Sequence, residues 1–271
     1  MQYQESKPFG RLASYIKCYW SIEYQNSGPS EPEPIVPDGC IEIVFDLADR
    51  FRQFNLDGST EIQPDVLVAG QMRSSVLVGP TGNVSLFGIR FMPTGAARFF
   101  RGQLSELSDR ITPLDLVWGN SVNIVTERLA GVGSFAEKVA IVEELLDARL
   151  DFVDEMEPSV EQAVKLILKG NGLMPIPAIA RSAGISDRGL VRKFRQLIGI
   201  SPKSYSRIVR FQRVLRSFES DPLIEVPDVA IKYGYYDQSH LINDFRQYAG
   251  LTPTEFRARN NKITEAFIAN D

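Results

Sequence analysis

The chain has 271 residues, of which 44% are hydrophobic and 24% are charged, and its formal net charge is −4. These values are typical of a globular protein long enough for two domains, and they exclude a disordered or collagen-like chain. One histidine and two cysteines are too few for a metal site built on imidazoles or thiolates. We therefore expect no metal, no other cofactor, no catalytic residues and no enzyme.

The net charge conceals a split along the chain. Residues 171–262 carry 15 Lys and Arg against 8 Asp and Glu, whereas residues 1–170 carry 15 against 24. A basic segment joined to an acidic one indicates that one domain binds nucleic acid and the other has a different task. No run approaches 18 apolar residues, and the first residues lack the apolar core of a signal peptide. We expect a cytoplasmic protein with no membrane contact.

Residues from about 12 to 92 are predicted to be rich in β-strands, because short apolar and β-branched runs alternate with Gly, Pro, Asn and Asp. The polar segment 25–34 is expected to be an exposed loop. Strands of this kind bury their apolar faces in a sandwich or a partial barrel. The expected strands are Ala13–Tyr24, Ile41–Phe45, Val66–Ala69, Val76–Val78 and Val84–Phe91.

Two charged residues, Glu42 and Arg90, lie inside these strands. We expect them at exposed or rim positions; if they point inward instead, they are the candidates to bind an effector. Cys18 and Cys40 are expected to be buried thiols. The sequence Pro37-Asp38-Gly39 is typical of a turn between a loop and a strand.

Helical periodicity begins after Pro93. The expected helices are Thr94–Arg101, Val122–Leu129 and Ser134–Phe152. The third has an apolar stripe that includes Val142, Leu145 and Leu146, and two interpretations of it stay open. The stripe packs against the domain's own sheet, or it pairs two subunits. A domain boundary is expected near Glu155–Pro158, where a further helix to Lys169 begins.

An internal repeat with a spacing of about 50 residues follows. Its first copy runs from Ile176-Pro-Ala-Ile-Ala to Gly184, and its second copy runs from Val226-Pro-Asp-Val-Ala to Gly234. Proline suits the first turn of a short helix, alanine lets two helices cross closely, and glycine permits a left-handed turn. Each copy therefore predicts a helix-turn-helix unit.

The second helices of the two units are expected at about 186–197 and 237–248. Each buries an apolar row at i, i+4 and i+7, so the opposite face is free to lie in a major groove with its N-terminal part at base edges. The rows are Leu190, Phe194 and Leu197 in the first unit and Leu241, Phe245 and Tyr248 in the second.

A helix from Pro202 to about Phe218 is expected to join the two units. At ~1.5 Å per residue it spans about 25 Å, which suits two reading helices about one DNA turn (~34 Å) apart. Thr252 and Glu255 then form a capping box for a last helix. The basic residues on the joining helix are Lys203, Arg207, Arg210, Arg213 and Arg216.

At these residues the sequence resembles the AraC family of transcription regulators, over a span from Glu157 to Lys262. The motifs that carry the resemblance are Ser201-Pro-Lys-Ser-Tyr205, Gly234-Tyr-Tyr-Asp-Gln-Ser-His-Leu and Phe245-Arg-Gln-Tyr-Ala-Gly-Leu-Thr-Pro253. The resemblance implies that DNA bases are contacted by Arg188, Val191, Arg192, Gln238, Ser239, His240, Ile242 and Asn243. Val191 cannot hydrogen-bond a base and Asn243 stands where many relatives have Arg, so the family's target sequences do not transfer.

Further partners follow from the same resemblance. Contacts with DNA phosphates are expected from Arg195, Lys203, Arg210 and Arg246. Double-stranded DNA and RNA polymerase are the implied partners, and a small-molecule effector and a homodimer are further expectations. The motifs Val36-Pro-Asp-Gly-Cys-Ile-Glu-Ile-Val-Phe45 and Phe87-Gly-Ile-Arg-Phe-Met-Pro resemble the sensor domains found ahead of such units. This second resemblance implies a regulatory, cupin-like β domain and supplies no ligand.

We therefore predict an α+β fold with three parts. Residues 1–154 form a β-rich effector-binding and dimerisation domain with helices from about 94. Residues 155–262 form an all-α domain of two helix-turn-helix units joined by a linker helix, and residues 263–271 form a tail. The predicted function is a sequence-specific, effector-responsive transcription regulator that binds two adjacent major grooves.

Three other functions compete with this prediction. A cupin-type metal enzyme fused to a DNA-binding module is opposed by the lack of any histidine before His240. A DNA-repair alkyl acceptor with a four-thiolate zinc site would need more than two cysteines. An architectural DNA binder without a ligand would be favoured by a closed N-terminal core with no ligand-sized cavity.

Overall fold

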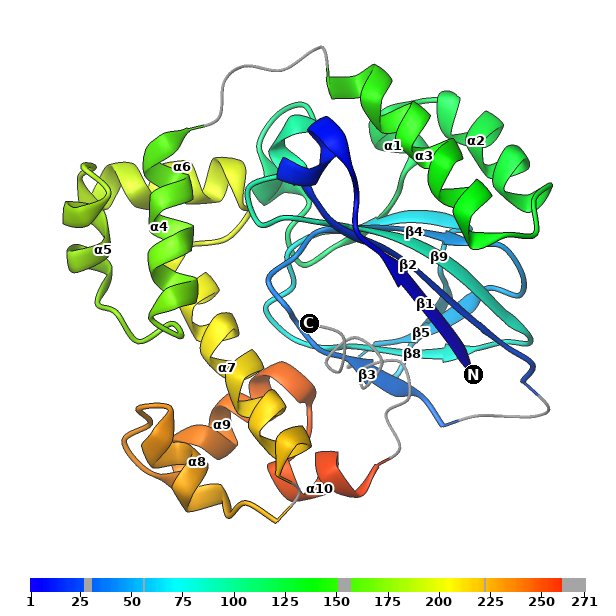
Figure 1. The fold of residues 1–271 in the computed structure, drawn as a ribbon. Coiled ribbons are helices and arrows are strands. Elements are labelled where there is room, and N and C mark those ends of the chain that lie inside the picture. The colour runs from blue at the N-terminus through cyan, green and yellow to red at the C-terminus, as the bar shows by residue number, and fades with distance from the viewer. Residues whose placement is uncertain (27–30, 56, 151–156, 222, 260–271) are drawn as a thin grey trace.

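A computed structural model describes residues 1–26, 31–55, 57–150, 157–221 and 223–259 (Figure 1). A β-rich N-terminal domain, blue to green in the figure, lies beside an all-helical C-terminal domain, green to red. The predicted α+β fold is thereby confirmed. The expected boundary after residue 154 and the tail 263–271 lie outside the described residues.

Two antiparallel sheets build the N-terminal domain. The larger has the strand order β1-β2-β9-β4-β7-β10 and the smaller has the order β3-β8-β5-β6. The strands are β1 (Gln2–Ser6), β2 (Ile16–Tyr24), β3 (Glu33–Ile35), β4 (Glu42–Asp46), β5 (Phe51–Phe54), β6 (Thr60–Ile62), β7 (Val66–Ala69), β8 (Val76–Pro80), β9 (Val84–Phe91) and β10 (Ile111–Pro113).

The longer strands agree with the expectation, and β7 and β9 have the predicted bounds. Strand β2 begins only at Ile16, because residues Gly10–Ser14 form a short 3-10 helix. Strands β1, β3, β5, β6 and β10 were not predicted, and the first two residues of β3 lie in the segment expected to be a loop. These strands have three to five residues each and little apolar alternation, so they form by pairing with neighbouring strands rather than from a local sequence pattern.

The alternation of side chains along a strand decides which residues face the space between the sheets. On β2 and β9, Tyr19 and Phe87 belong to the core under the helices, whereas Trp20 and Leu86 belong to the core between the two sheets. Arg90 lies four residues after Leu86 and so points the same way. Its register partner on β4 is Glu42.

Helices α1 (Asp115–Trp118), α2 (Ser121–Ala130) and α3 (Phe135–Leu150) cover the outer face of the larger sheet (Figure 1). Val142 and Leu146 on α3 are fully buried in one core with Phe87 of β9. The apolar stripe therefore packs on its own domain, and the two residues expected beyond Leu150 lie outside the described residues. The prediction of a helix at 94–101 is wrong, since only a 3-10 turn, Ala96–Arg98, forms there.

The C-terminal domain contains the helices predicted from the repeat. The turns contain Gly184 and Gly234 with φ of 68° and 65°, a left-handed backbone that favours glycine. No described helix is long and apolar enough to cross a membrane. The helices are α4 (Pro158–Lys169), α5 (Ile176–Ser182), α6 (Asp187–Leu197), α7 (Pro202–Ser220), α8 (Val226–Lys232), α9 (Gln238–Ala249) and α10 (Pro253–Ala258), the last with the expected capping box at Thr252 and Glu255.

Candidate DNA-binding surface and interdomain cavity

Helices α6 and α9 are each fixed at the N-terminus and along one side. The Ser186 hydroxyl accepts a hydrogen bond from Gly189 N at the start of α6, and the Asp237 carboxylate accepts one from His240 N at the start of α9. Leu190, Phe194, Leu241 and Phe245 are fully buried in one core. Caps and buried rows together fix which side of each helix faces solvent.

The residues predicted to contact bases lie on that solvent-facing side. Val191 and Ile242 are half-buried, and the ring of His240 packs edge-on against Tyr235 with 5.2 Å between ring centroids. Among the described residues, Arg188 and Arg192 have no carboxylate partner. The exposed members of the set are Arg188, Arg192, Gln238, Ser239, His240 and Asn243.

The four residues predicted to contact phosphates divide into two kinds. Arg195, Lys203 and Arg246 are exposed. Arg210 instead lies inside the domain: its Nη2 is 3.1 Å from Asp244 Oδ2, and its guanidinium lies 4.0 Å from the centre of the Tyr235 ring. These contacts leave the Arg210 side chain only 13% exposed, so we exclude it from the proposed DNA-contacting set.

Asp244 ties the second reading helix to the joining helix, a contact that the sequence did not reveal. Its side chain is 1% exposed and receives Arg207 Nη2 at 2.7 Å as well as Arg210. Since a buried carboxylate without a partner is costly, the two arginines of α7 fix the position of α9. No local motif predicts this pairing, which spans 34 and 37 residues.

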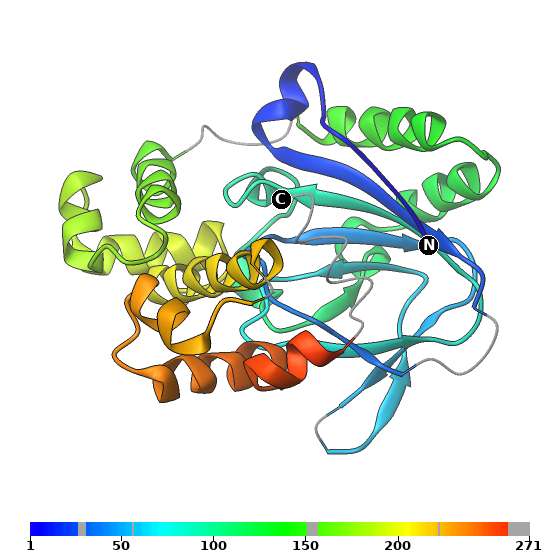
Figure 2. The same cartoon turned by 60° about the horizontal axis from the view of Figure 1, so that its bottom comes forward.

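The N-terminal domain contacts the C-terminal ends of both reading helices and the middle of α7, which is drawn in yellow beside the sheets in Figure 2. Ser108 Oγ donates to Gly199 O just after α6 at 2.8 Å, and Gln247 Nε2 of α9 lies 3.5 Å from Arg73 O. Gln212 Nε2 of α7 donates to Pro37 O at 2.7 Å. The N-terminal halves of α6 and α9, which carry the predicted base contacts, are outside this contact.

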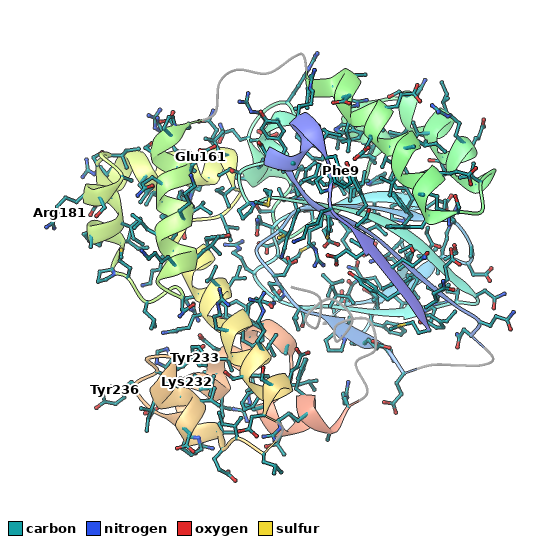
Figure 3. The ribbon with its side chains drawn as sticks, in the orientation of Figure 1. Phe9, Glu161, Arg181, Lys232, Tyr233 and Tyr236 are labelled. Carbon is teal, nitrogen blue, oxygen red and sulfur yellow. The ribbon has the colours of Figure 1, made fainter. Side chains whose placement is uncertain are left out.

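The opposite side of the C-terminal domain is not covered by the β-rich domain. Arg181 of α5 and Tyr236, which is 93% exposed, point away from it (Figure 3). Together with the exposed starts of α6 and α9, this leaves the C-terminal domain open to a large partner.

The loops that touch the C-terminal domain are also bonded to each other. Gln71 Nε2 donates to Gly39 O at 2.8 Å, and Arg73 N donates to Asp109 Oδ1 at 2.8 Å. The Arg73 guanidinium also binds the Asp109 carboxylate. Loops 37–40, 71–75 and 104–109 thus form one connected surface, which we call the interdomain loops.

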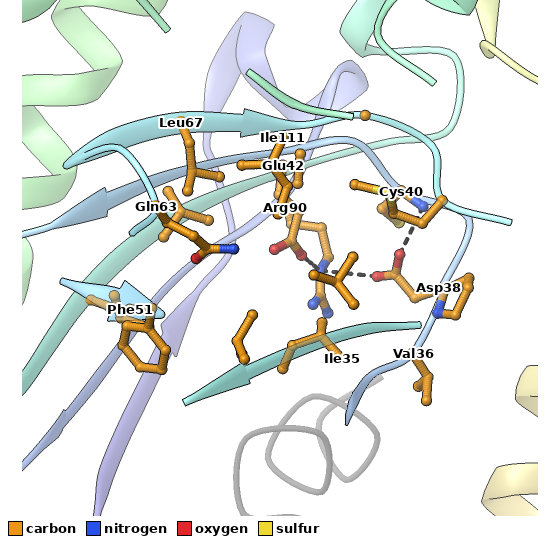
Figure 4. A pocket seen from close by; sticks show the side chains of 18 of the residues that line it. Ile35, Val36, Asp38, Cys40, Glu42, Phe51, Gln63, Leu67, Arg90 and Ile111 are labelled. Atoms are coloured by element: carbon orange, nitrogen blue, oxygen red, sulfur yellow. Dashed lines mark hydrogen bonds and ion pairs between the residues drawn. The ribbon is translucent and has the colours of Figure 1, made fainter. Parts of the chain in front are cut away.

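A cavity of about 150 Å³ lies between the two sheets, beside the interdomain loops (Figure 4). Its walls come from both sheets and from Gln212 of α7, so both domains line it. Glu42 and Arg90 line this cavity with 14% and 5% of their side chains exposed. The expectation of exposed or rim positions is therefore wrong, and the inward-facing alternative is the one observed.

Arg90 lies between two carboxylates at one end of the cavity. Its Nε donates to Glu42 Oε1 and is 3.3 Å from Asp38 Oδ2, while Cys40 N donates to Asp38 Oδ1 at 2.9 Å (Figure 4). Asp38 was predicted only as part of a turn. The turn is present, with φ of 81° at Gly39, but its carboxylate also faces the cavity.

Burial and the neighbouring charges oppose each other at these groups. It raises the pKa of Glu42, against the effect of Arg90. Burial opposes ionisation of Asp38 as well, but Arg90, Lys17 and the N–H of Cys40 hold the pKa of Asp38 below its ordinary value. Burial also raises the pKa of Cys40 to about 12, so at neutral pH it is a thiol rather than a nucleophilic thiolate.

Two anchored helices with exposed polar starts, joined by a nineteen-residue helix, define a domain of two helix-turn-helix units. Comparison with known families agrees: residues 179–259 match a model described as "Helix-turn-helix domain". The same region is similar in sequence to transcription regulators, in agreement with the sequence resemblance. Residues 4–113 match a "Domain of unknown function (DUF6597)".

Two curated relatives are transcription regulators. The chain is 28% identical over 113 residues to the HTH-type transcriptional regulator GlxA of Rhizobium meliloti, covering 42% of this chain and 32% of the relative. It is 28% identical over 137 residues to the arabinose operon regulatory protein of Escherichia coli, covering 47% of each. The chain thus spans about a third to a half of these relatives.

Among solved structures, ToxT from Vibrio cholerae has a similar fold. The two share 8% sequence identity with a TM-score of 0.50, and the match covers 89% of this chain and 98% of ToxT. At this identity the similarity concerns the fold alone.

Proposed function

We propose that this chain is a sequence-specific DNA-binding transcription regulator that responds to a small molecule. The observation that carries the proposal is the set of exposed polar side chains at the starts of α6 and α9, on two helices held rigidly by caps and buried rows. The first half of a recognition helix is the part that reaches base edges in a major groove.

The chemistry of the two helices differs. Arg188 and Arg192 lie one turn apart on α6, and arginine pairs with guanine O6 and N7 through two hydrogen bonds. On α9, Gln238 and Asn243 suit adenine N6 and N7, and Ile242 suits a thymine methyl group. We propose that Arg195, Lys203 and Arg246 bind phosphates and set the register on the duplex.

The cavity supports the effector-responsive part of the proposal. Its wall includes Gln212 of α7, which hydrogen-bonds Pro37 next to the cavity residue Asp38. A molecule bound there would contact both domains at once. A ligand-sized cavity also opposes the architectural alternative, which required a closed N-terminal core.

Three finer parts of the proposal concern partners and location. A regulator of this kind acts with RNA polymerase at a promoter, in the cytoplasm. Pairing of two copies would have to use a surface other than the α3 stripe, because that stripe is buried. Leu116 on α1 and Ile124 on α2, 76% and 64% exposed, are the apolar side chains available on the helices that cover the sheet.

The relatives support a regulator rather than an enzyme. Both are named as regulatory proteins. The metal-enzyme alternative lacks imidazole ligands, since the sequence has a single histidine, His240, on the predicted DNA-reading helix.

A salt titration of DNA binding tests the proposal with the full chain. If about six to ten phosphates are contacted, affinity for a duplex should fall by roughly 10³- to 10⁵-fold between 50 and 200 mM salt. Lys203→Ala should reduce the slope of log affinity against log salt by about one. The matched control is Lys7→Ala, an exposed lysine of the N-terminal domain, which should not change it. Binding that does not respond to salt would contradict the proposal.

A further inference from the structure

The cavity between the two sheets has an apolar body and a polar end that is rich in carboxylates. The body is formed by side chains of both sheets, including the edge strand β10 of the larger sheet. The apolar residues that define it are Ile35, Phe51, Leu67, Val78, Leu86 and Ile111. Among the described residues, three carboxyl groups line the cavity, on Asp38, Glu42 and Asp46, against one cation, Arg90.

The carboxylates leave acceptor capacity unused at this end. Arg90 Nε donates to Glu42 Oε1 and lies 3.3 Å from Asp38 Oδ2, and within the described part of the chain this buried Asp38 oxygen accepts no hydrogen bond. Lys17 acts on both carboxyls but does not line the cavity. A bound molecule therefore meets hydrogen-bond acceptors at this end, and the one cation there is already shared between two acids.

Charge balance then selects the kind of molecule. A ligand carboxylate would place another negative charge beside Glu42 and Asp38 in a site with little solvent, where like charges repel strongly. A protonated amine would instead donate hydrogen bonds to acceptors that lack donors, and charge-assisted hydrogen bonds of this type are the strong ones. Burial raises the pKa of Glu42 against the effect of Arg90, so a cationic head beside it would stabilise the ionised carboxylate, whereas Arg90, Lys17 and the N–H of Cys40 already lower the pKa of Asp38.

We propose, on the basis of the regulator function proposed above, that this cavity binds hydrophobic amines: molecules with an apolar body and a cationic, hydrogen-bond-donating head. The head lies against Asp38 and Glu42, and the body fills the space between the sheets. A cavity of about 150 Å³ is the size that holds a benzene-like ring.

The position of Asp38 connects this ligand to the DNA-binding domain. Asp38 lies between Pro37, whose carbonyl accepts from Gln212, and Gly39, whose carbonyl accepts from Gln71. A cation that draws the Asp38 carboxylate away from Arg90 therefore moves the turn that α7 is bonded to.

The test uses the full chain and matched probes that differ only in the head. The first set is 2-phenylethylamine, 2-phenylethanol and phenylacetate; the second is octylamine, octanol and octanoate. Binding is measured by calorimetry and by the rise in Tm. We expect each amine to bind about tenfold or more tightly than the acid of its set. Equal or tighter binding of the acids, or no binding of any probe, would overturn the proposal.

Two variants locate the head, and each has a control. Glu42→Gln and Asp38→Asn keep the shape of the side chain and should each weaken amine binding about tenfold while leaving the alcohols unaffected. Asp65→Asn removes one charge from the same domain at the surface pair with Arg50, outside the cavity, and should change nothing. Val76→Phe fills the cavity and should abolish binding of amines and alcohols alike. Unchanged amine affinity in both carboxyl variants, or in the one that folds if the other does not, would contradict the assignment.

DNA binding measured on the same preparations separates the two proposals. Amine binding by a chain that shows no salt-dependent DNA affinity would contradict the proposed function and leave the ligand class standing. Salt-dependent DNA binding by a chain that prefers the acids would contradict the proposed ligand class and leave the proposed function standing.

Discussion

The side-chain amide of Gln212 donates a hydrogen bond to the carbonyl oxygen of Pro37, 2.7 Å away, and joins the helix between the two reading units to the turn that carries Asp38. Gln212 is 7% exposed, so water does not replace this bond freely. It is a direct link between the wall of the cavity and the scaffold of the DNA-binding domain.

Gln212→Leu should therefore uncouple ligand binding in the cavity from the affinity for DNA. The substitution keeps the volume but leaves Pro37 O without its donor, at a cost of about 1–3 kcal/mol. We expect the ratio of DNA affinities with and without 2-phenylethylamine to move towards one, as measured by fluorescence anisotropy. Ser220→Ala, at the exposed end of the same helix, is the control and should keep the wild-type ratio. An unchanged ratio in Gln212→Leu would show that the coupling takes another route.

Arg210→Ala should destabilise the C-terminal domain rather than weaken a phosphate contact. The substitution removes one of two cations from the buried Asp244 and the cation stacked on Tyr235, which should lower the free energy of unfolding by about 2–4 kcal/mol. Urea unfolding followed by circular dichroism measures this change. Arg195→Ala, at an exposed arginine of α6, should stay within about 0.5 kcal/mol. If both variants unfolded at the same urea concentration as wild type, the structural role of Arg210 would be refuted.

The stability of the N-terminal domain should depend on pH through Asp46. Burial raises the pKa of this carboxyl from 3.8 to about 6, so between these pH values the folded state binds more protons than the unfolded state. Its destabilising effect is absent below about pH 4 and complete above about pH 6, and the free energy of unfolding falls as pH rises through this window. Asp46→Asn should remove this slope and, at pH 7, be more stable by roughly 1–2 kcal/mol, a value reduced for the solvent that still reaches the group.

Urea titrations at pH 4, 5, 6 and 7 measure the Asp46 effect. Asp115→Asn is the control, since this exposed carboxylate is not among the groups that act on Asp46, and it should retain the wild-type slope from pH 4 to 6. If the pH slope persists in Asp46→Asn, another titrating group causes it and the role of Asp46 is contradicted.

A charge on the α3 stripe should unfold the N-terminal domain. Leu146 is fully buried with Phe87 and Val142, so Leu146→Glu buries an unpaired carboxyl, and aggregation or loss of near-ultraviolet circular dichroism is expected. Ile124→Glu, on the exposed side of α2, should fold normally. If it also lowers the mass measured by light scattering, the α2 surface pairs two copies. A folded Leu146→Glu would contradict the packing described here.

The sequence predicted the C-terminal domain far better than the cavity, for a physical reason. Local periodicity predicts helices α6 and α9 from the apolar rows that contain Leu190, Phe194, Leu241 and Phe245. The turn before each helix has a glycine at the same place, Gly184 or Gly234. Both signals act over fewer than twenty residues, and the repeat presents them twice. All the predicted buried positions of these rows lie in the domain's core or pack against it.

The cavity depends on contacts between distant segments. Arg90 meets Glu42 across 48 residues, and Pro37 meets Gln212 across 175. Strand alternation places Glu42 and Arg90 on one face, but only the pairing of β4 with β9 shows that this face looks toward the second sheet. The turn at Asp38 has a clear sequence signature, but no local pattern indicates whether its carboxylate points into the cavity or toward solvent.

The most direct test of the account is a randomised-site selection with the full-length chain, repeated with Arg192→Ala and Asn243→Arg. The two recognition helices should select two enriched boxes, one containing guanine and one richer in A and T, centred about one helical turn (~10 bp) apart. Arg192→Ala should lose the guanine preference of the first box, worth about 1–3 kcal/mol, and leave the second box intact. Asn243→Arg should shift the second box toward guanine. Uniform weakening on all sequences, with no base position changed, would contradict the account.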